Sequence, residues 1–472
     1  MRPLISILLT AALAVGGPAF ADNHPKRDAT KGPRAPAPYR LDPYPSTYRP
    51  LPRGDVLIVH ATVLDGDDHR FDDAGVMLHD GKVAAIGPNL TAAAGVTVID
   101  ARGRWVTPGI IDIHSHDGDF QTPFTSQQLV HSDVSEATEP DAANVWAEHS
   151  VSVQDPSFTR ALAGGVTTLQ ILPGSDDLFG GRSVILKNVP AVTVEAMKFP
   201  GAPYGLKMAC GENPLHQFGD QGKFPSSRMG NFAGYREEWI KAKEYQAKWE
   251  AYERGEADDP PHRDLKLDTL VGALNGDIRV HMHCYRAEEM AQVIDMSREF
   301  GYHVAAFHHA VEAYKIAPML AQAGVCAVVW SDWWGYKFEA FDSIRENAAF
   351  VDAAGGCVAM HSDSNIIGQR LTVEAGKAMA AGRRAGLTIT PEHAIAWVTR
   401  NPARAMGLDG QVGSLQVGKN ADMVIWSGDP FSIYSKADQV FIDGALIFDR
   451  FDPKRRPVLD FELGQPSRGN QP

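Results

Sequence analysis

Histidines and an aspartate recur in this 472-residue sequence at the ends of short apolar runs. The clearest pair, His114 and His116, closes a run rich in β-branched residues that begins after a Pro-Gly turn. Such a run is typical of a buried strand, and residues two apart on a strand point to the same face. Two neutral imidazoles side by side form half of a metal site, although two solvated loop histidines would have the same pattern.

Later strand-like runs end in the same residue types: His281 and His283, His308 and His309, and His361 and Asp363. Alternation puts His308 and His309 on opposite faces, with His309 in phase with Ala305 and Phe307. If His309 is the inward residue, His308 lies behind the ligands or against a helix. A carboxylate such as Asp363 is costly at the end of an apolar strand unless a metal or a positive partner neutralises it. The alternatives are a hydrogen-bonded core histidine at His283 and a turn or helix-capping aspartate at Asp363.

The stretch VTPGIIDIHSHDG, residues 106–118, closely resembles the signature of the amidohydrolase superfamily. The stretch GKNADMVIW, residues 418–426, is similar to the C-terminal strand motif of that family. Three shorter stretches, GENP at 211–214, EAYK at 312–315 and SDWW at 331–334, resemble an exported subgroup of its imidazolonepropionase-like and metal-dependent dipeptidase branch. The resemblance implies an α/β fold, with a TIM-like (β/α)8 barrel and a small β-sandwich formed by the N- and C-terminal segments.

The resemblance also implies a ligand set for one or two divalent metal ions, with zinc as the expected metal. The implied ligands are His114, His116, Lys207, His283, His309 and Asp363. Many binuclear members of the family bridge two metals with a carbamylated lysine, whereas others use a glutamate or no bridge. Lys207 lies inside an apolar strand, where a lysine needs a partner or a modification, and Glu212 follows as the alternative ligand or a substrate contact.

Asp363 is the predicted catalytic residue, because a carboxylate near a metal-activated water can take its proton and pass it to the leaving nitrogen. His281 and His361 share faces with predicted ligands and are further candidates for the metal or the substrate. Other candidates follow strand ends, where barrels place their binding loops. These are Tyr314, Lys315, Trp333, Trp334 and Lys337, with plain packing as the alternative for the tryptophans.

The length and the 44% hydrophobic content fit a barrel plus a second domain with a large core. Strand-like and helix-like segments alternate over 107–405, with a polar helical insertion at about 211–270. Within this region, Pro173-Gly174-Ser175 and Gly180-Gly181 predict a glycine-rich loop, and 235–256 predicts an exposed amphipathic helix. Short strands and turns over 54–106 and 406–462 read as the two parts of the β-sandwich.

The N-terminus has the pattern of a secretory signal peptide over 1–21: a basic start, an apolar run and the ending Ala19-Phe20-Ala21. A membrane anchor is the alternative, but the run is short for a bilayer. We therefore expect export, to the periplasm, and no stable membrane anchor after cleavage. Residues 22–53 read as a proline-rich, poorly ordered lead, and 463–472 as a flexible tail.

The formal net charge of −13, without a Lys/Arg block, argues against nucleic acid and anionic membranes as partners. The four cysteines are Cys210, Cys284, Cys326 and Cys357. Each lies in or beside an apolar strand-like run and none forms a CxxC motif. We expect mostly buried free thiols, with one disulfide as the alternative because export permits it. The sequence is compatible with a homo-oligomer.

Taken together, the sequence predicts an exported metal-dependent hydrolase that cleaves a carbon–nitrogen bond in a small molecule. The bond would belong to a cyclic amide, an N-acyl amino acid or a dipeptide. A deaminase acting on a heterocycle would use similar ligands and is the main alternative. A non-catalytic metal-containing binding protein is a weaker one, because the full His/Asp set points to catalysis.

Overall fold

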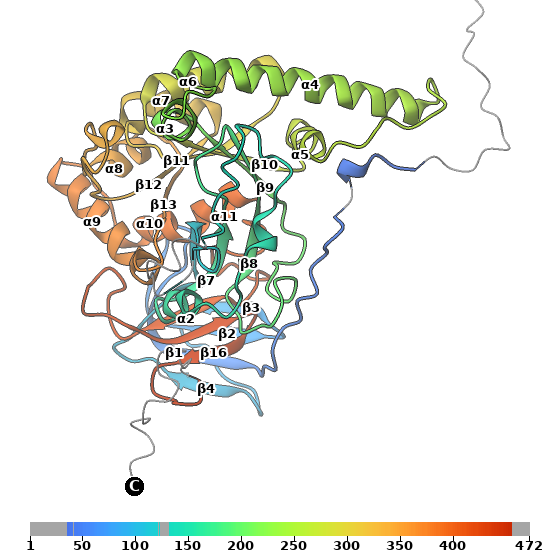
Figure 1. Cartoon of the computed structure of the whole chain (residues 1–472). Coiled ribbons are helices and arrows are strands. Elements are labelled where there is room, and N and C mark those ends of the chain that lie inside the picture. Colours follow the sequence, from blue (N-terminus) through green and yellow to red (C-terminus); the bar gives the residue numbers. More distant parts are fainter. Residues whose placement is uncertain (1–34, 41, 121, 123–131, 456–472) are drawn as a thin grey trace, which may run out of the picture.

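The computed structural model describes residues 35–40, 42–120, 122 and 132–455. Figure 1 shows a barrel surrounded by helices, with a sheet built from both ends of the chain packed below it. The predicted signal peptide, residues 1–21, and the predicted tail, residues 463–472, lie outside the described residues.

The barrel consists of eight strands, each paired with its neighbour in sequence. They are β6 (Ile110–Ser115), β7 (Val166–Ile171), β8 (Phe179–Lys187), β9 (Gly205–Ala209), β10 (Arg279–Cys284), β11 (Val304–His309), β12 (Cys326–Val329) and β13 (Val358–Met360). Just beyond β13, the Asp363 backbone N–H donates to the His114 carbonyl at 2.9 Å and so links the last strand to the first. The predicted TIM-like barrel is confirmed.

Strand β8 departs from the expected alternation of strands and helices. It pairs antiparallel with both β7 and β9, whereas the other paired barrel strands are parallel. The prediction of a loop at Gly180 and Gly181 is wrong, because both residues lie in β8. Gly181 has a φ of 106°, and a Cβ there would lie 2.4 Å from the carbonyl oxygen of Val145. The glycine at 181 thus allows a close contact with the Val145 backbone and does not form a turn.

The helices lie outside the barrel or above it. The α-helices are α2 (Pro156–Ala163), α3 (Glu212–Gly219), α4 (Arg228–Arg254), α5 (Leu265–Leu274), α6 (Ala287–Phe300), α7 (Ala317–Ala323), α8 (Asn347–Ala353), α9 (Leu371–Arg384), α10 (Pro391–Ala394) and α11 (Arg400–Met406). Short 3₁₀ helices are η1 (Pro38–Arg40), η2 (Ala147–His149), η3 (Ala313–Ile316), η4 (Phe338–Ala340), η5 (Ile367–Arg370) and η6 (Ile395–Val398). In the described part of the chain, no helix combines the length and apolar character needed to cross a membrane.

Helix α4 crosses the top of the molecule in Figure 1 and is the longest helix of the predicted insertion. The prediction that this helix is exposed is wrong for its aromatic face. Tyr235 and Trp239 are fully buried. Trp239 stacks on Tyr302, with ring centroids 4.4 Å apart, and the Tyr235 hydroxyl donates to the carbonyl of Ala209 at the end of β9. The aromatic residues therefore attach the insertion to the barrel.

Both ends of the chain contribute to the second sheet. Its strands are β1 (Val56–Leu64), β2 (Arg70–His79), β3 (Lys82–Gly87), β4 (Thr97–Asp100), β5 (Trp105–Pro108), β14 (Met423–Trp426), β15 (Ala437–Ile442) and β16 (Ala445–Asp449). The two segments meet where β5 pairs antiparallel with β14, Val106 opposite Ile425. The sheet has its own hydrophobic cluster, which includes Ile58, Val76 and Met423.

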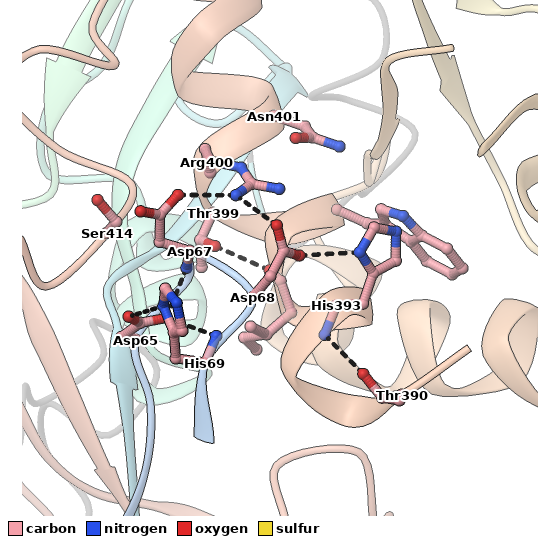
Figure 2. Close-up of polar contacts among 12 residues, drawn as sticks. Asp65, Asp67, Asp68, His69, Thr390, His393, Thr399, Arg400, Asn401 and Ser414 are labelled. Atoms are coloured by element: carbon pink, nitrogen blue, oxygen red, sulfur yellow. Dashed lines mark hydrogen bonds and ion pairs between the residues drawn. The ribbon is translucent and has the colours of Figure 1, made fainter. Parts of the chain in front are cut away.

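A polar seam joins this sheet to the barrel helices (Figure 2). Arg400 of α11 contacts Asp67 and Asp68, in the turn after β1, through Nη1 at 2.8 and 2.9 Å. His393 of α10 lies between two carboxylates, with Nδ1 2.8 Å from Asp68 and Nε2 2.9 Å from Asp352. These ion pairs fix how the sheet sits against the barrel.

The part of the lead that the structure describes is anchored, so the expectation of poor order is wrong there. The backbone N–H of Ala37 donates to Glu253 of α4 at 3.1 Å. Farther along, the Tyr48 hydroxyl donates to Asp443 at 2.6 Å. Figure 1 shows the segment running from α4 down to the sheet. Specific polar contacts hold it, which the composition of the segment did not reveal.

The prediction of free thiols is wrong. All four cysteines are paired, as Cys210–Cys284 and Cys326–Cys357. The first pair joins the ends of neighbouring strands β9 and β10, and the second joins β12 to the residue before β13. Cysteines far apart in sequence meet because adjacent barrel strands carry them side by side.

Candidate active site

Three of the predicted ligands meet at the carboxyl ends of β6 and β13. His114 Nε2 lies 3.5 Å from Asp363 Oδ1, and His116 Nε2 lies 3.2 Å from the same oxygen. Ligand atoms of the three residues all lie within 4.8 Å of one another. The Asp363 side chain is 25% exposed, so it is accessible from outside. This geometry brings one carboxylate and two imidazoles to a single point.

A second group of imidazoles adjoins the first. His114, His309 and His361 also have ligand atoms within 4.8 Å of one another, and the His283 ring lies 4.5 Å from that of His309. Both nitrogens of His283 and of His361 are buried and lack a hydrogen-bond partner in the described chain. Buried polar atoms without partners are costly. A bound cation would satisfy these lone pairs, so the residues present fit a metal.

Burial sets the charge of most of these rings, because it disfavours the protonated form. It lowers the pKa of His114, His281, His283, His308, His309 and His361. Burial would lower the pKa of His116 too, but the carboxylates of Asp119 and Asp363 raise it to about 9. Burial acts to raise the pKa of Asp363, yet the contact with His116 keeps it below its ordinary value. Asp363 is thus ionised at neutral pH.

His308 lies behind a predicted ligand, as expected, because its ring contacts His114. The opposite faces predicted for His308 and His309 are not seen, since both rings contact His114. His309 adopts a φ of 68° and Ala310 a φ of 37°, so the strand ends in left-handed backbone and regular alternation fails. His308 Nδ1 lies 2.9 Å from His114 Nδ1, and its Nε2 lies 2.9 Å from His281 Nδ1.

Lys207 and Glu212, the two alternatives for the remaining ligand, lie in different places. Lys207 is fully buried in β9, where its Nζ donates to the Pro173 carbonyl at 2.8 Å and burial lowers its pKa to about 8. Its charge acts on the pKa of His114 and of neighbouring imidazoles. Glu212 instead starts α3, where it lies 3.7 Å from Lys337 in a separate cavity of about 440 Å³.

Two carboxylates near the site were missed from the sequence. Asp119 is fully buried, with Oδ1 3.8 Å from His116 Nδ1. Asp112 accepts from the Ser362 hydroxyl and, at 3.2 Å, from the Ser362 backbone N–H, and so ties β6 to the segment that carries Asp363. The run of aspartates directly after the HSH motif was a signal for Asp119. For Asp112 the only sequence signal was its position inside an apolar strand.

A cavity of about 540 Å³ opens beside the cluster. It is lined by His116, Phe120, Val134, Arg160, Trp333, Asp363, Ser364, Asn365 and Ile366. Trp333 stacks on Trp330 at 4.5 Å, and Trp330 stacks in turn on His309 at 4.4 Å. The aromatic wall of the cavity is therefore continuous with the ligand cluster.

The other predicted substrate contacts do not line this cavity. Lys315 pairs with Glu312 at 2.9 Å and with Asp342 at 2.5 Å, and the Tyr314 hydroxyl donates to the Asp342 carbonyl at 3.1 Å. Trp334 is 63% exposed. Of the candidates after strand ends, only Trp333 lines the cavity that contains Asp363.

Comparisons with known proteins agree with this architecture. The amidohydrolase family profile matches residues 105–448. A solved amidohydrolase from Thermotoga maritima MSB8 shares 34% identity and a TM-score of 0.77, over 84% of this chain and 100% of that one. The amidohydrolase tasK of Hapsidospora irregularis is 30% identical over 376 residues, which span 75% of this chain but 37% of that protein. An imidazolonepropionase of Pseudomonas putida is 25% identical over 393 residues, 78% of this chain and 90% of that one.

This chain therefore belongs to the amidohydrolase family, whose members hydrolyse carbon–nitrogen bonds. The barrel, the sheet built from both ends of the chain and the His/Asp cluster are the features that this membership predicts.

Proposed function

We propose that this chain hydrolyses a carbon–nitrogen bond of a small amide, using water activated at a divalent metal site. The observation that carries the proposal is the set of buried imidazole nitrogens without hydrogen-bond partners in the described chain, gathered beside the ionised Asp363. Imidazole and carboxylate are the ligands that zinc takes in catalytic sites. His114, His116 and Asp363 would hold one ion, and His283 and His309, with His361 beside them, a second.

Lys207 supports the two-ion arrangement if it becomes a carbamate. A neutral amine attacks carbon dioxide, a nitrogen–carbon bond forms, and one proton leaves to give an anion with two oxygens. Burial favours the neutral amine, since it lowers the lysine pKa to about 8. Glu212 is the weaker candidate, because its carboxylate is already close to Lys337.

Metal analysis tests this assignment. Protein prepared with zinc and bicarbonate should hold about two ions per chain, Lys207→Ala about one, and Glu212→Ala as many as the wild type. If the metal content is the same in all three proteins, neither residue is a ligand.

The reaction follows from the positions of the side chains. A bound divalent ion lowers the pKa of water and polarises a carbonyl. Asp363 has one oxygen against the two imidazoles and is partly exposed to the cavity. Its carboxylate can take the proton of the attacking water and deliver it to the leaving nitrogen. Asp119, on the far nitrogen of His116, holds that ring in place.

The cavity narrows the choice among the candidate substrates. Its walls are mostly apolar, with Phe120, Val134, Trp333 and Ile366, and Arg160 is its only lysine or arginine among the described residues. No ion pair or side-chain hydrogen bond joins this guanidinium to another described residue. Guanidinium groups bind carboxylates through paired hydrogen bonds. An N-acyl amino acid or a dipeptide with an apolar side chain matches this lining better than an uncharged cyclic amide.

A hydrolysis screen of the zinc-loaded protein tests the proposed function. The panel contains N-acetyl-L-phenylalanine, L-leucyl-L-phenylalanine, an uncharged cyclic amide and an aminated heterocycle, with amino acid and ammonia measured separately. Release of phenylalanine is expected. Ammonia from the heterocycle alone would show a deaminase, and no turnover on any carbon–nitrogen substrate would contradict the proposal.

Export to the periplasm is part of the same proposal. It is supported by the N-terminal sequence pattern and by the two disulfides of the described chain, which persist in oxidising compartments. Protein sequencing of exported material should start at Asp22, and recovery of Met1 would contradict cleavage.

A further inference from the structure

A line of three buried imidazoles runs from the ligand cluster into the barrel. His114 Nδ1 lies 2.9 Å from His308 Nδ1, and His308 Nε2 lies 2.9 Å from His281 Nδ1. None of the three residues is more than 1% exposed. Because β6 and β11 are not neighbours in the sheet, the contact between His114 and His308 crosses the interior of the barrel.

The two nitrogen–nitrogen contacts couple the tautomers of the three rings. A neutral imidazole has one N–H and one lone pair. A lone pair at His114 Nε2 requires the proton at Nδ1, which can then only be donated to His308 Nδ1. His308 must consequently carry its proton at Nε2 and donate it to His281 Nδ1. The described residues place no carboxylate in ion-pair range of His281 or His308, so nothing compensates an extra charge on these buried rings.

We propose that His308 and His281 are positioning residues, which hold His114 in the tautomer that presents its Nε2 lone pair to the metal site. This inference rests on the metal site of the proposed function. In most sites a carboxylate or a backbone carbonyl accepts the proton of the ligand's far nitrogen. For His116 a carboxylate is at least near, because Asp119 lies within ion-pair range of its Nδ1, at 3.8 Å. His114 differs, because its acceptor is a neutral ring fixed by another neutral ring.

A matched pair of variants tests the proposal. Leu and Asn have the same branched shape, but only Asn offers an oxygen that can accept the His114 Nδ1 proton. The dissociation constant for Zn²⁺ is measured by competition with a chelator, alongside the unfolding temperature of the metal-free proteins. His308→Leu should weaken zinc binding by about 10–100-fold, whereas His308→Asn should stay close to the wild type.

Nitrogen-15 NMR of the zinc-loaded wild type supplies a second measurement, with the proton expected at His114 Nδ1 and at His308 Nε2. A proton at His308 Nδ1 overturns the proposal, and this holds even if His308→Leu fails to fold. Equal zinc affinity in all three proteins also overturns it, as does an equal loss in both variants, which packing alone would produce. Hydrolysis is assayed separately. A wild type that cleaves no amide but shows the expected affinities would refute the proposed reaction and leave this inference standing.

Discussion

Arg160 is the residue that we propose for substrate selection in the cavity. It lines the same cavity as Asp363, together with apolar side chains such as Phe120 and Trp333. Two lysines near the cluster are already engaged. Lys207 donates to the Pro173 carbonyl, and the Nζ of Lys337 donates to Asn213 and lies 4.0 Å from the centre of the Tyr285 ring. We therefore propose Arg160 as the residue that binds a charged group of the substrate.

Replacing this charge should impair binding of acidic substrates only. Hydrogen bonds to charged groups contribute about 1.5–3 kcal/mol, so Arg160→Gln should raise the KM for N-acetyl-L-phenylalanine by about 10–100-fold. The KM for the matching phenylalanine amide should hardly change. Arg298→Gln, at an exposed arginine paired with Asp295, is the control. An unchanged KM in the Arg160 variant would contradict the proposal that Arg160 binds the substrate carboxylate.

Residue types and alternation brought the proposed ligands together, because a strand end fixes the direction of the side chain that follows it. His114 and His116 share a face and both reach Asp363, as that rule requires. Regular alternation fails at His309, whose left-handed backbone lets both its ring and that of His308 contact His114. The strand-end rule also placed Tyr314 and Lys315 at the correct end of the barrel. It did not predict their contacts, because local ion pairs with surface carboxylates decide where such side chains point.

At the scale of elements, two features were beyond sequence patterns. Strand β8 contains glycines that resemble a turn, and only the neighbouring residue Val145 explains why position 181 needs a glycine. The disulfides depend on which strands are adjacent, and strand order is a tertiary property. The sequence predicted an amphipathic helix over 235–256, but the burial of its aromatic residues against Tyr302 follows from the path of the chain.

The disulfides allow a direct check of strand adjacency. In guanidinium without reductant, the protein should show essentially no free thiol by Ellman's reagent, and after reduction its four cysteines should react. Loss of a native disulfide typically costs about 2–5 kcal/mol of stability. The variant Cys210→Ser/Cys284→Ser should therefore unfold at lower denaturant concentration. Free thiols in the unreduced wild type would contradict the pairing.

At the scale of the whole molecule, the seam of Figure 2 couples the sheet to the barrel and depends on pH. The Asp352 carboxylate, together with Asp68, raises the pKa of His393 to about 9. A histidine has a pKa of about 6.5 in the unfolded chain. The stabilisation by the charged ring is thus complete below about pH 6.5 and is lost as the pH rises through about 9.

His393→Gln should therefore lower the free energy of unfolding at pH 6 and have little effect at pH 10. The loss at pH 6 should be about 1 kcal/mol, because a side chain that is 37% exposed is screened by solvent. Urea unfolding at both pH values measures it. His216→Gln, at an exposed pair with Asp220 at one end of α3, serves as control. A loss that is equal at both pH values would show that packing, not charge, matters at the seam.

The joining of the two chain ends was predicted from the family motif at 418–426, whose last four residues form β14 and pair with β5. The path of the proline-rich lead was not predicted, because a few specific contacts, such as that of Tyr48 with Asp443, hold it and leave no periodic pattern in the sequence. Sequence patterns therefore gave the layers of the molecule, while isolated side-chain contacts set the connections between them.

The central claim, that Asp363 moves the proton at a metal site, is tested most directly by Asp363→Asn. Asparagine keeps the size and one acceptor oxygen but loses the charge and the capacity to hold the proton. Turnover of a wild-type substrate and zinc content are measured on the same folded preparation. We expect zinc to remain bound through the histidines and turnover to fall by about 10²–10⁴-fold. Normal turnover by the zinc-loaded variant would contradict the mechanism.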